Sequence, residues 1–313
     1  MSHAQRPLAL VTGATGFVAR TLIPHLRAQG YRVRAAVRKS CDGPWDESVV
    51  TGDLSRPLDW RNAVAGVSHV FHLAARVHVM HETAADPIAA FRQVNVERTR
   101  ELCDAAASAG VRRLVFLSSV KVIGEATQPG KPFRAKDAPA PLEPYAISKA
   151  EAEDVVRGGP VESVIVRPPL IYGPGVGANF ARLIAAVEAG HWLPLGAVHN
   201  RRDLVFVGNL ADALVRLATH PAAAGNTYLI SDGESLSTAA LIRAIATAMQ
   251  RPCRLLPVPQ PLLRTALRLA GKHQEAERLL ESLEVDISDL QRDLGWTPPF
   301  SVQAALAASI AAR

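Results

Sequence analysis

The chain has 313 residues, of which 48% are hydrophobic and 20% charged, so it has ample apolar material for a large core and does not have the composition of a disordered chain. Its formal charge is +6 and its basic residues are scattered, which favours a small anionic ligand over nucleic acid. No apolar run reaches the roughly 18 residues of a membrane helix, and no secretory leader is visible. Three widely spaced cysteines make no disulfide framework, so we expect a cytoplasmic protein without membrane insertion.

The first half of the chain alternates short apolar runs with amphipathic stretches, the pattern of β-α-β units around a parallel sheet. The apolar runs predict strands at 8–12, 32–37, 49–51, 69–72, 114–118 and 161–167. The stretches between them predict helices at 17–28, 58–65, 91–108 and 145–157. Together they predict an α/β fold of the Rossmann type, a doubly wound parallel sheet that forms a dinucleotide-binding domain over residues 1–167.

The regular alternation of strand and helix patterns ends after residue 167, where prolines and glycines mark a loop-rich junction. Residues 168–313 predict a smaller, mainly substrate-binding C-terminal region. Its predicted helices lie at 180–189, 211–219, 237–249 and 304–312, with a Pro-rich turn at 257–261. We expect the segment near 203–220 to return to the first domain, with a strand at 204–207 beside the sheet.

A glycine-rich turn follows the first predicted strand and reads Thr-Gly-Ala-Thr-Gly-Phe-Val-Ala over residues 12–19. Glycines allow a tight turn and a close backbone approach, and the N–H groups and dipole at the following helix N-terminus suit a pyrophosphate. The alternative is an ordinary strand–turn–helix in which the glycines serve only the turn.

Two charged positions bear on the adenosine half of a dinucleotide. The second predicted strand ends in Arg38-Lys39, and a basic side chain there suits the 2′-phosphate of NADP, whereas an acidic one would accept from the 2′-hydroxyl of NAD. The pair therefore favours NADP over NAD, unless both cations are only solvated surface groups. Asp53 could accept from the adenine amino group or could serve as a helix N-cap.

Tyr145 and Lys149 lie four residues apart, which places them on one face of a predicted helix. A phenol with a pKa near ~10 exchanges protons poorly at neutral pH unless a cation favours phenolate. The Lys149 ammonium can supply that field and make Tyr145 a general acid/base for a hydroxyl/carbonyl pair. The pair alone could also be an ordinary exposed helix face. Ser118 and Ser119 end the preceding strand, at the edge where open α/β sheets bind ligands.

These motifs together resemble the extended short-chain dehydrogenase/reductase family, which includes nucleotide-sugar epimerases, dehydratases and keto-reductases. Further matching segments are His72-Leu73-Ala74-Ala75, Asn95-Val96, Arg167-Pro168, Tyr172-Gly173-Pro174, Arg202-Asp203-Leu204-Val205 and Leu294-Gly295-Trp296. By this resemblance Tyr145 is the catalytic acid/base, Lys149 tunes it and holds the nicotinamide ribose, and Ser119 contacts the reacting sugar centre. The cofactor contacts that the resemblance implies are Gly13, Thr15, Gly16, Phe17 and Val18 in the glycine turn, with Arg38, Asp53, Leu54, Leu73, Ala74, Ala75, Tyr145, Lys149 and Pro168 elsewhere.

The resemblance also implies substrate contacts. Asn179 and Arg202 match positions that contact the diphosphate of a nucleotide sugar, and an arginine fork suits phosphate oxygens. Ser118 and Ser119 are expected at the sugar, and Lys121 could reach the substrate or be a solvated surface lysine.

The chain departs from the family pattern at several of these positions. Leu170 stands where the family often has asparagine, and Arg98 replaces a glycine. Dehydratases place acidic residues where this chain has Val120 and Lys121, so we do not expect a dehydratase.

The strings 118–125 and 167–173 look most like enzymes of UDP-N-acetylhexosamine derivatives in surface-polysaccharide pathways, including 4-keto reductases that make N-acetylquinovosamine. The resemblance implies an NAD(P)-dependent oxidoreductase that reduces a 4-keto group at C4 of a UDP-linked hexose or N-acetylhexosamine. The alternative is a UDP-hexose 4-epimerase with tightly held NAD, and Arg38-Lys39 favours the reductase. A non-catalytic dinucleotide-sensing protein is a further alternative, disfavoured by the presence of Tyr145, Lys149 and Ser119.

The remaining expectations concern metals, cysteines and assembly. His72, His78 and His81 lack a ligand partner at metal-site spacing, so no metal is expected. Cys41 has no activating partner and is not expected to be catalytic. The family pairs the helices at 91–108 and 145–157 across a dimer interface, so the resemblance implies a homodimer.

Overall fold

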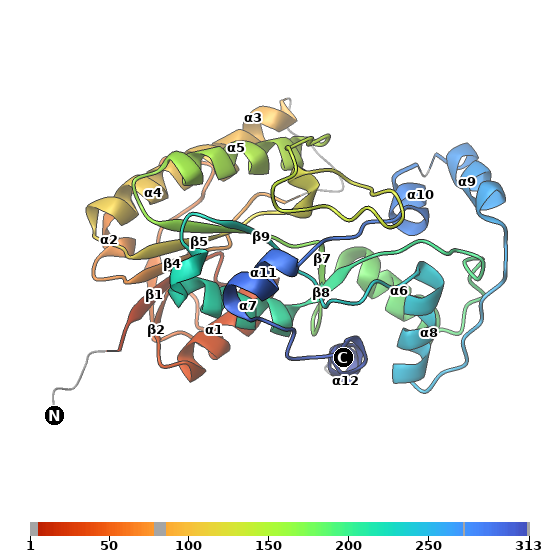
Figure 1. Cartoon of the computed structure of the whole chain (residues 1–313). Coiled ribbons are helices and arrows are strands. Elements are labelled where there is room, and N and C mark those ends of the chain that lie inside the picture. The colour runs from red at the N-terminus through yellow and green to blue at the C-terminus, as the bar shows by residue number, and fades with distance from the viewer. Residues whose placement is uncertain (1–5, 78–85, 272, 312–313) are drawn as a thin grey trace.

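The computed structural model describes residues 6–77, 86–271 and 273–311. Its centre is a seven-stranded sheet in the order β3-β2-β1-β4-β5-β6-β9, with parallel neighbours throughout (Figure 1). The strands are β1 (Leu8–Thr12), β2 (Arg32–Val37), β3 (Glu47–Val50), β4 (His69–His72), β5 (Arg113–Leu117), β6 (Ser163–Arg167) and β9 (Thr227–Leu229). All their carboxyl ends therefore lie at one edge, and the predicted Rossmann-type α/β fold is confirmed.

The central strands are buried on both faces, which explains their nearly continuous apolar sequences. Every residue of β1 and of β6 is buried. Neighbouring residues of β1 contribute to different cores: Ala9 and Val11 belong to the core on one face, and Leu8 and Leu10 to the core on the other. The sheet is thus the middle layer of three.

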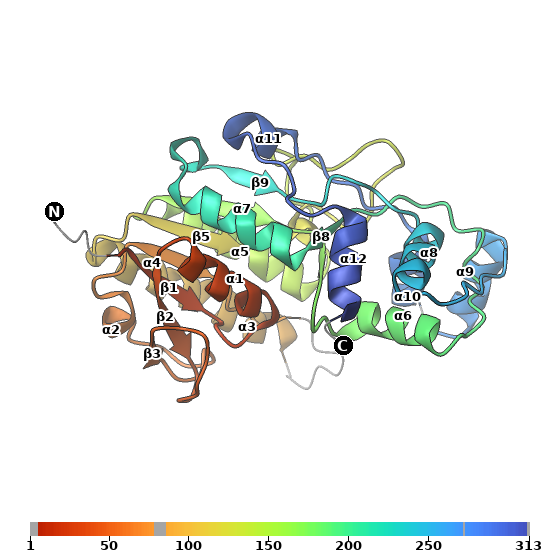
Figure 2. The ribbon, with the colours of Figure 1, turned by 90° about the horizontal axis from the view of Figure 1, so that it is seen from below.

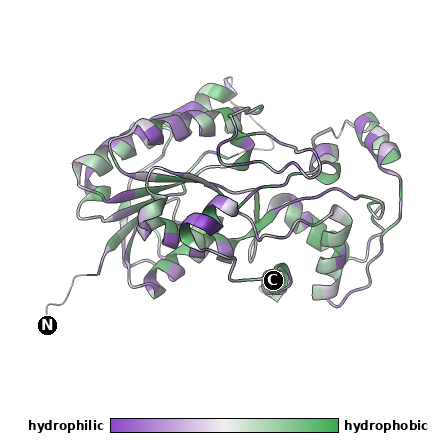
Figure 3. Cartoon of the chain, in the orientation of Figure 1, coloured by the Kyte–Doolittle hydropathy of each residue, from purple (hydrophilic) through white to green (hydrophobic). Residues whose placement is uncertain are grey.

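Helices cover both faces of the sheet (Figures 1 and 2). One face carries α2 (Arg61–Val64), α3 (Pro87–Arg92), α4 (Arg98–Ser108) and α5 (Pro144–Gly158), and the other carries α1 (Phe17–Ala28) and α7 (Val207–Thr219). Green and purple residues alternate along these helices in Figure 3, as expected where one side of a helix packs on a sheet and the other meets solvent.

The predicted helix at 91–108 is divided into three parts. It begins earlier, at Pro87, because Asp86 accepts from the N–H of Ala89 and proline suits the first helical position. A π-helical turn, η1 (Gln93–Glu97), then separates α3 from α4. In this turn Asn95 is buried and its amide pairs with the backbone N–H and carbonyl of Arg76. A π-turn inserts one extra residue, and periodicity alone does not reveal it.

The C-terminal region holds its own apolar core. Its elements are the short parallel pair β7 (Leu170–Tyr172) and β8 (Leu204–Phe206), with helices α6 (Ala178–Glu188), α8 (Thr238–Ala248), α9 (Gln260–Leu269), α10 (His273–Leu280) and α12 (Val302–Ala311). Three further short elements are η2 (Val120–Val122), η3 (Pro221–Ala223) and α11 (Ser288–Leu294). Among the described residues, none of the helices is long and apolar enough to span a bilayer.

The strand predicted at 204–207 is present as β8, but its expected place beside the main sheet is wrong. β8 pairs with β7, and the strand that joins the main sheet is β9, next to β6. β9 has only three residues, too few for a periodic signal. The helix that follows β8, α7, does pack against α1 and β5. The division of the chain at residues 167 and 168 into two domains stays a prediction.

Candidate active site

A cleft of about 680 Å³ opens at the carboxyl ends of the strands. It is built around the neighbouring strands β1 and β4. The strand order runs in opposite directions from this pair, and open α/β sheets bind ligands at such a switch point. Predicted site residues from seven separate segments line this one cleft: Gly13, Thr15, Gly16, Phe17, Val18, Arg38, Asp53, Leu54, Leu73, Ala74, Ala75, Ser118, Ser119, Tyr145 and Pro168.

The glycine turn between β1 and α1 has the geometry of an anion cradle. Gly13 has φ +66°, and a Cβ there would lie 2.9 Å from the backbone nitrogen of Ala74, so only glycine fits without displacement. The N–H of Gly16 donates to the carbonyl of Gly13 at 2.9 Å. Gly16 precedes α1, whose start has neither a side-chain cap nor an acidic first-turn residue within the described structure. Its free N–H groups and positive dipole end therefore fit a dinucleotide pyrophosphate.

Thr12 is a cleft residue that the sequence analysis missed. Its Oγ1 accepts from the N–H groups of Leu73 and Ala74 at 3.2 and 3.1 Å, and lies 2.7 Å from Nδ1 of His72. Thr12 ends β1 as Ser118 follows β5, so the rule that polar groups at strand ends meet at a ligand site would have found it.

His72 is a buried link in a chain of hydrogen bonds. Thr12 Oγ1 already accepts two hydrogen bonds, so its own hydroxyl proton is donated to Nδ1 of His72. The ring proton of His72 is therefore on Nε2, which donates to Thr99 Oγ1 at 2.9 Å. Burial lowers the pKa of His72 to about 3, so the ring is neutral. Both ring nitrogens have protein partners, and the other two histidines considered for a metal, His78 and His81, lie outside the described residues.

The same chain of hydrogen bonds continues to the helix that carries the tyrosine. Thr99 Oγ1 donates to the carbonyl of Asn95, and Asn95 Nδ2 donates to Ser148 Oγ at 2.9 Å. Ser148 Oγ in turn donates to the carbonyl of Tyr145 at 2.8 Å. The backbone beside the glycine turn is thereby connected to the first turn of α5.

The part of the cleft for which adenosine contacts were predicted carries charged side chains. Arg38 is exposed just after β2, and its charge acts on Asp53 across the cleft mouth. Asp53 accepts from the N–H of Ser55 at 2.9 Å, and the Ser55 hydrogen bonds, with a smaller contribution from Arg38, hold the pKa of Asp53 below its ordinary value. The alternative that Asp53 is a helix N-cap is wrong, since α2 starts at Arg61.

Tyr145 stands in the first turn of α5 and faces the cleft. Its ring meets the ring of Phe91 edge-on, with centroids 6.2 Å apart. Burial raises the pKa of Tyr145 to about 12, and a hydrogen bond with Ser119 acts in the opposite direction. The phenol oxygen of Tyr145 and the hydroxyl oxygen of Ser119, which interact by a hydrogen bond, therefore lie together at the carboxyl edge of the sheet.

Lys149 is buried one turn further along α5, outside the lining of the cleft. Its Nζ donates to the carbonyl of Leu117 at 2.7 Å and lies 3.8 Å from the centre of the Phe116 ring. Burial lowers the pKa of Lys149 to about 7, with the carboxylate of Glu153 opposing the shift. Its charge thus depends on pH in the neutral range.

Four predicted substrate residues make contacts within the protein. Ser118 lines the cleft, but its hydroxyl donates to Glu153 at 2.5 Å. Lys121 lies outside the lining and pairs with Glu125 at 3.1 Å and Glu143 at 2.7 Å.

The other two lie in the C-terminal region. Asn179, on α6, accepts from Arg182, and Nη1 of Arg202 donates to the carbonyl of Glu281 at 3.0 Å. The roles of all four in substrate binding stay predictions.

Comparison with known proteins places this arrangement in a family. Residues 9–231 match the NAD dependent epimerase/dehydratase family, and the chain belongs to it. It is 40% identical over 300 residues to a UDP-glucose 4-epimerase of Vibrio cholerae, covering 94% of this chain and 92% of that protein. It is 31% identical over 334 residues to a 3-beta-hydroxysteroid dehydrogenase of Mycolicibacterium neoaurum, covering 95% and 89%.

A solved structure gives the same result. MoeE5 in complex with UDP-glucuronic acid and NAD superposes with a TM-score of 0.76 at 26% identity, and the match covers 97% of both chains. The resemblance inferred from the motifs is confirmed.

Proposed function

We propose that this enzyme acts at C4 of a UDP-linked hexose or N-acetylhexosamine. The observation that carries the proposal is the placing of the Tyr145 phenol and the Ser119 hydroxyl in the same cleft as the glycine turn. The UDP-glucose 4-epimerase relative and the UDP-glucuronic acid complex of MoeE5 support the choice of a UDP-sugar. When bound, NAD or NADP accepts or supplies the hydride exchanged with the sugar carbon.

Residues of the cleft accept and return the proton of the sugar's C4 hydroxyl. Tyr145 takes the proton of the C4 hydroxyl during oxidation and returns it to the oxygen during reduction. Ser119 hydrogen-bonds both that oxygen and the phenol, and a charged Lys149 favours the phenolate form of Tyr145. Burial raises the pKa of Tyr145 to about 12 even with the opposing hydrogen bond of Ser119, so the charge of Lys149 has to lower it further towards neutrality.

The 4-epimerase is the form that the relatives favour, since the Vibrio cholerae protein is a UDP-glucose 4-epimerase. The same tyrosine then serves twice. It acts first as the base and, after the 4-keto sugar has rotated to present its opposite face, as the acid. A 4-keto reductase in surface-polysaccharide precursor synthesis is the second candidate, favoured by Arg38 at the adenosine end of the cleft. A non-catalytic dinucleotide sensor is disfavoured because Tyr145 and Ser119 both face the cleft.

The test is to purify the protein, release and quantify any bound dinucleotide, and incubate the protein with UDP-hexoses and UDP-4-keto-hexoses. Stoichiometric NAD with interconversion of two C4 epimers would support the epimerase. Consumption of added NADPH with a 4-keto sugar would support the reductase. Absence of both conversions, in protein that binds dinucleotide, would contradict the proposed substrate class.

Replacing Arg38 by glutamine should reveal which dinucleotide the cleft prefers. If Arg38 binds a 2′-phosphate, affinity for NADPH should fall by about tenfold or more, the value of one charged hydrogen bond, while affinity for NADH stays within about twofold. Fluorescence titration with both dinucleotides measures the difference. Arg56→Gln is the control, since Arg56 is exposed and outside the cleft lining. Equal losses for both dinucleotides would contradict a role in selectivity.

The homodimer and the cytoplasmic location are also part of the proposal. They rest on the family resemblance of the helices at 91–108 and 145–157 and on the cysteine pattern. Light scattering on the purified protein tests the first, and cell fractionation tests the second.

A further inference from the structure

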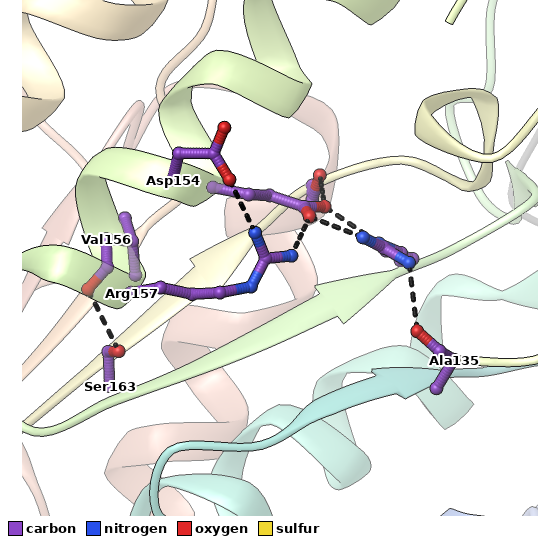
Figure 4. Close-up of polar contacts among 8 residues, drawn as sticks. Ala135, Asp154, Val156, Arg157 and Ser163 are labelled. Carbon is purple, nitrogen blue, oxygen red and sulfur yellow. Dashed lines mark hydrogen bonds and ion pairs between the residues drawn. The ribbon is translucent and has the colours of Figure 1, made fainter. Parts of the chain in front are cut away.

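Glu153 is a fully buried carboxylate on α5, one turn beyond Lys149. Arg167, at the end of β6 and also buried, donates to both of its oxygens, from Nε at 2.9 Å and from Nη2 at 2.6 Å. Arg157 donates to it from the next turn of the helix, and Ser118 donates through its hydroxyl. Figure 4 shows this cluster, with Arg157 also reaching Asp154 and the buried arginine continuing to the carbonyl of Ala135.

The partners of Glu153 connect it to the reacting groups on two sides. Ser118 is the neighbour of Ser119, which bonds Tyr145. On the other side, the Glu153 carboxylate acts on Lys149 and favours its charged form. The Glu153 carboxylate thus contacts Ser118 at the end of β5, beside Ser119, and its negative charge also acts on Lys149.

Among the described residues, the other titratable or charged groups on the elements packed around Lys149 include a neutral histidine, several ion pairs and the exposed Asp104 of α4. On β4, His72 is neutral, and on β6, Arg167 is bound to Glu153. The ion pairs on the remaining neighbours are Arg98–Glu101 of α4, Arg92–Glu151 between α3 and α5, and Lys121 of η2 with Glu125 and Glu143. Tyr145, on the same helix as Lys149, has its pKa raised to about 12 and is neutral at pH 7.

We infer that Glu153 is a positioning residue of the active site, whose carboxylate keeps the Lys149 ammonium charged in apolar surroundings and, through Ser118, fixes the strand end that carries Ser119. The inference deepens the proposed function and rests on it for the role of Lys149 at the cofactor. Purely structural ion pairs of this kind also occur, and replacing both partners of such a pair by uncharged groups can leave a fold intact. The two roles therefore have to be separated by a measurement that stability alone would not change.

That measurement is the affinity for NADH as a function of pH. Burial already lowers the pKa of Lys149 to about 7, and Glu153 opposes that shift. Removing the carboxylate lowers the pKa further, so Lys149 loses its charge at a lower pH. In Glu153→Gln, the pH at which NADH affinity weakens should fall by about one unit, so the loss relative to wild type is about tenfold near pH 8 and small near pH 5.

Two further variants make the test decisive. Asp154→Asn is the matched control, because Asp154 is the adjacent carboxylate, contacts the same Arg157 and is exposed, and its titration should follow wild type. Glu153→Gln combined with Arg167→Met leaves no unpaired buried guanidinium and covers the case in which the single variant fails to fold. The double variant should keep the shift to lower pH.

A purely structural role predicts a different result. It would give an unshifted pH dependence in the folded double variant, and that outcome would overturn the inference. The readout needs no sugar substrate, so a protein that converts no UDP-sugar but shows the shift contradicts only the proposed substrate class.

Discussion

Tyr145→Phe should lower kcat by about 10²–10⁴-fold, the range expected when a positioned acid/base is removed. The change deletes one oxygen and keeps the ring that packs edge-on against Phe91. Dinucleotide affinity should stay within about twofold, because the contacts of the glycine turn are untouched. The measurement is steady-state turnover of the substrate identified by the UDP-sugar panel, with NADH titration in parallel.

Tyr31→Phe is the control for this prediction. Tyr31 is another buried tyrosine with a raised pKa, but its hydroxyl lies 3.5 Å from Nδ1 of His69, outside the cleft lining. Its removal should leave kcat nearly unchanged. Equal turnover by wild type and Tyr145→Phe would refute the assigned role of the phenol.

Lys149→Met should reduce kcat/KM by about 10²–10³-fold, comparable to the loss of one preorganised hydrogen-bond donor, and should weaken dinucleotide binding as well. The pKa of Lys149 is about 7, so the wild-type ammonium is present below that pH and is lost as the pH rises through it. Wild-type NADH affinity should therefore fall between about pH 6 and pH 8, whereas the affinity of the variant should be flat over this range.

The control for Lys149→Met is Lys131→Met, which removes an exposed lysine elsewhere in the chain. Binding and turnover of that variant should match wild type at every pH. A pH-dependent NADH affinity that persists in Lys149→Met would assign the titration to another group.

The parts of this fold that follow from sequence are those encoded locally. The sequence predicts β1 and β2 with their observed ends. β1 is a nearly continuous apolar run, as a buried parallel strand needs, whereas β2 alternates two arginines with apolar residues before its buried end. The glycine turn, the serines after β5 and Tyr145 could be assigned to one cleft, since parallel strands bring their carboxyl ends to one edge.

The remainder depends on contacts between distant segments. The sequence indicates a strand at 204–207, where β8 lies, but not that β8 pairs with the three-residue strand β7. The Glu153 cluster combines a strand end, a helix and a second strand, and no spacing in the sequence relates them. The break at Asn95 was missed for the same reason, because it depends on a pairing with the backbone of Arg76.

The neutral His72 has a consequence for how substrates could diversify in this family. Its two ring bonds belong to a series of hydrogen bonds that runs from the backbone at Ala74 to the carbonyl of Tyr145 and passes through the backbone and the side chain of Asn95. Residues of β1, β4, η1, α4 and α5 therefore link the backbone beside the glycine turn to the first turn of the helix that carries the phenol. A sugar epimerase and a steroid dehydrogenase are both relatives of this chain, and we expect their substrates to be distinguished by the helices beyond β7.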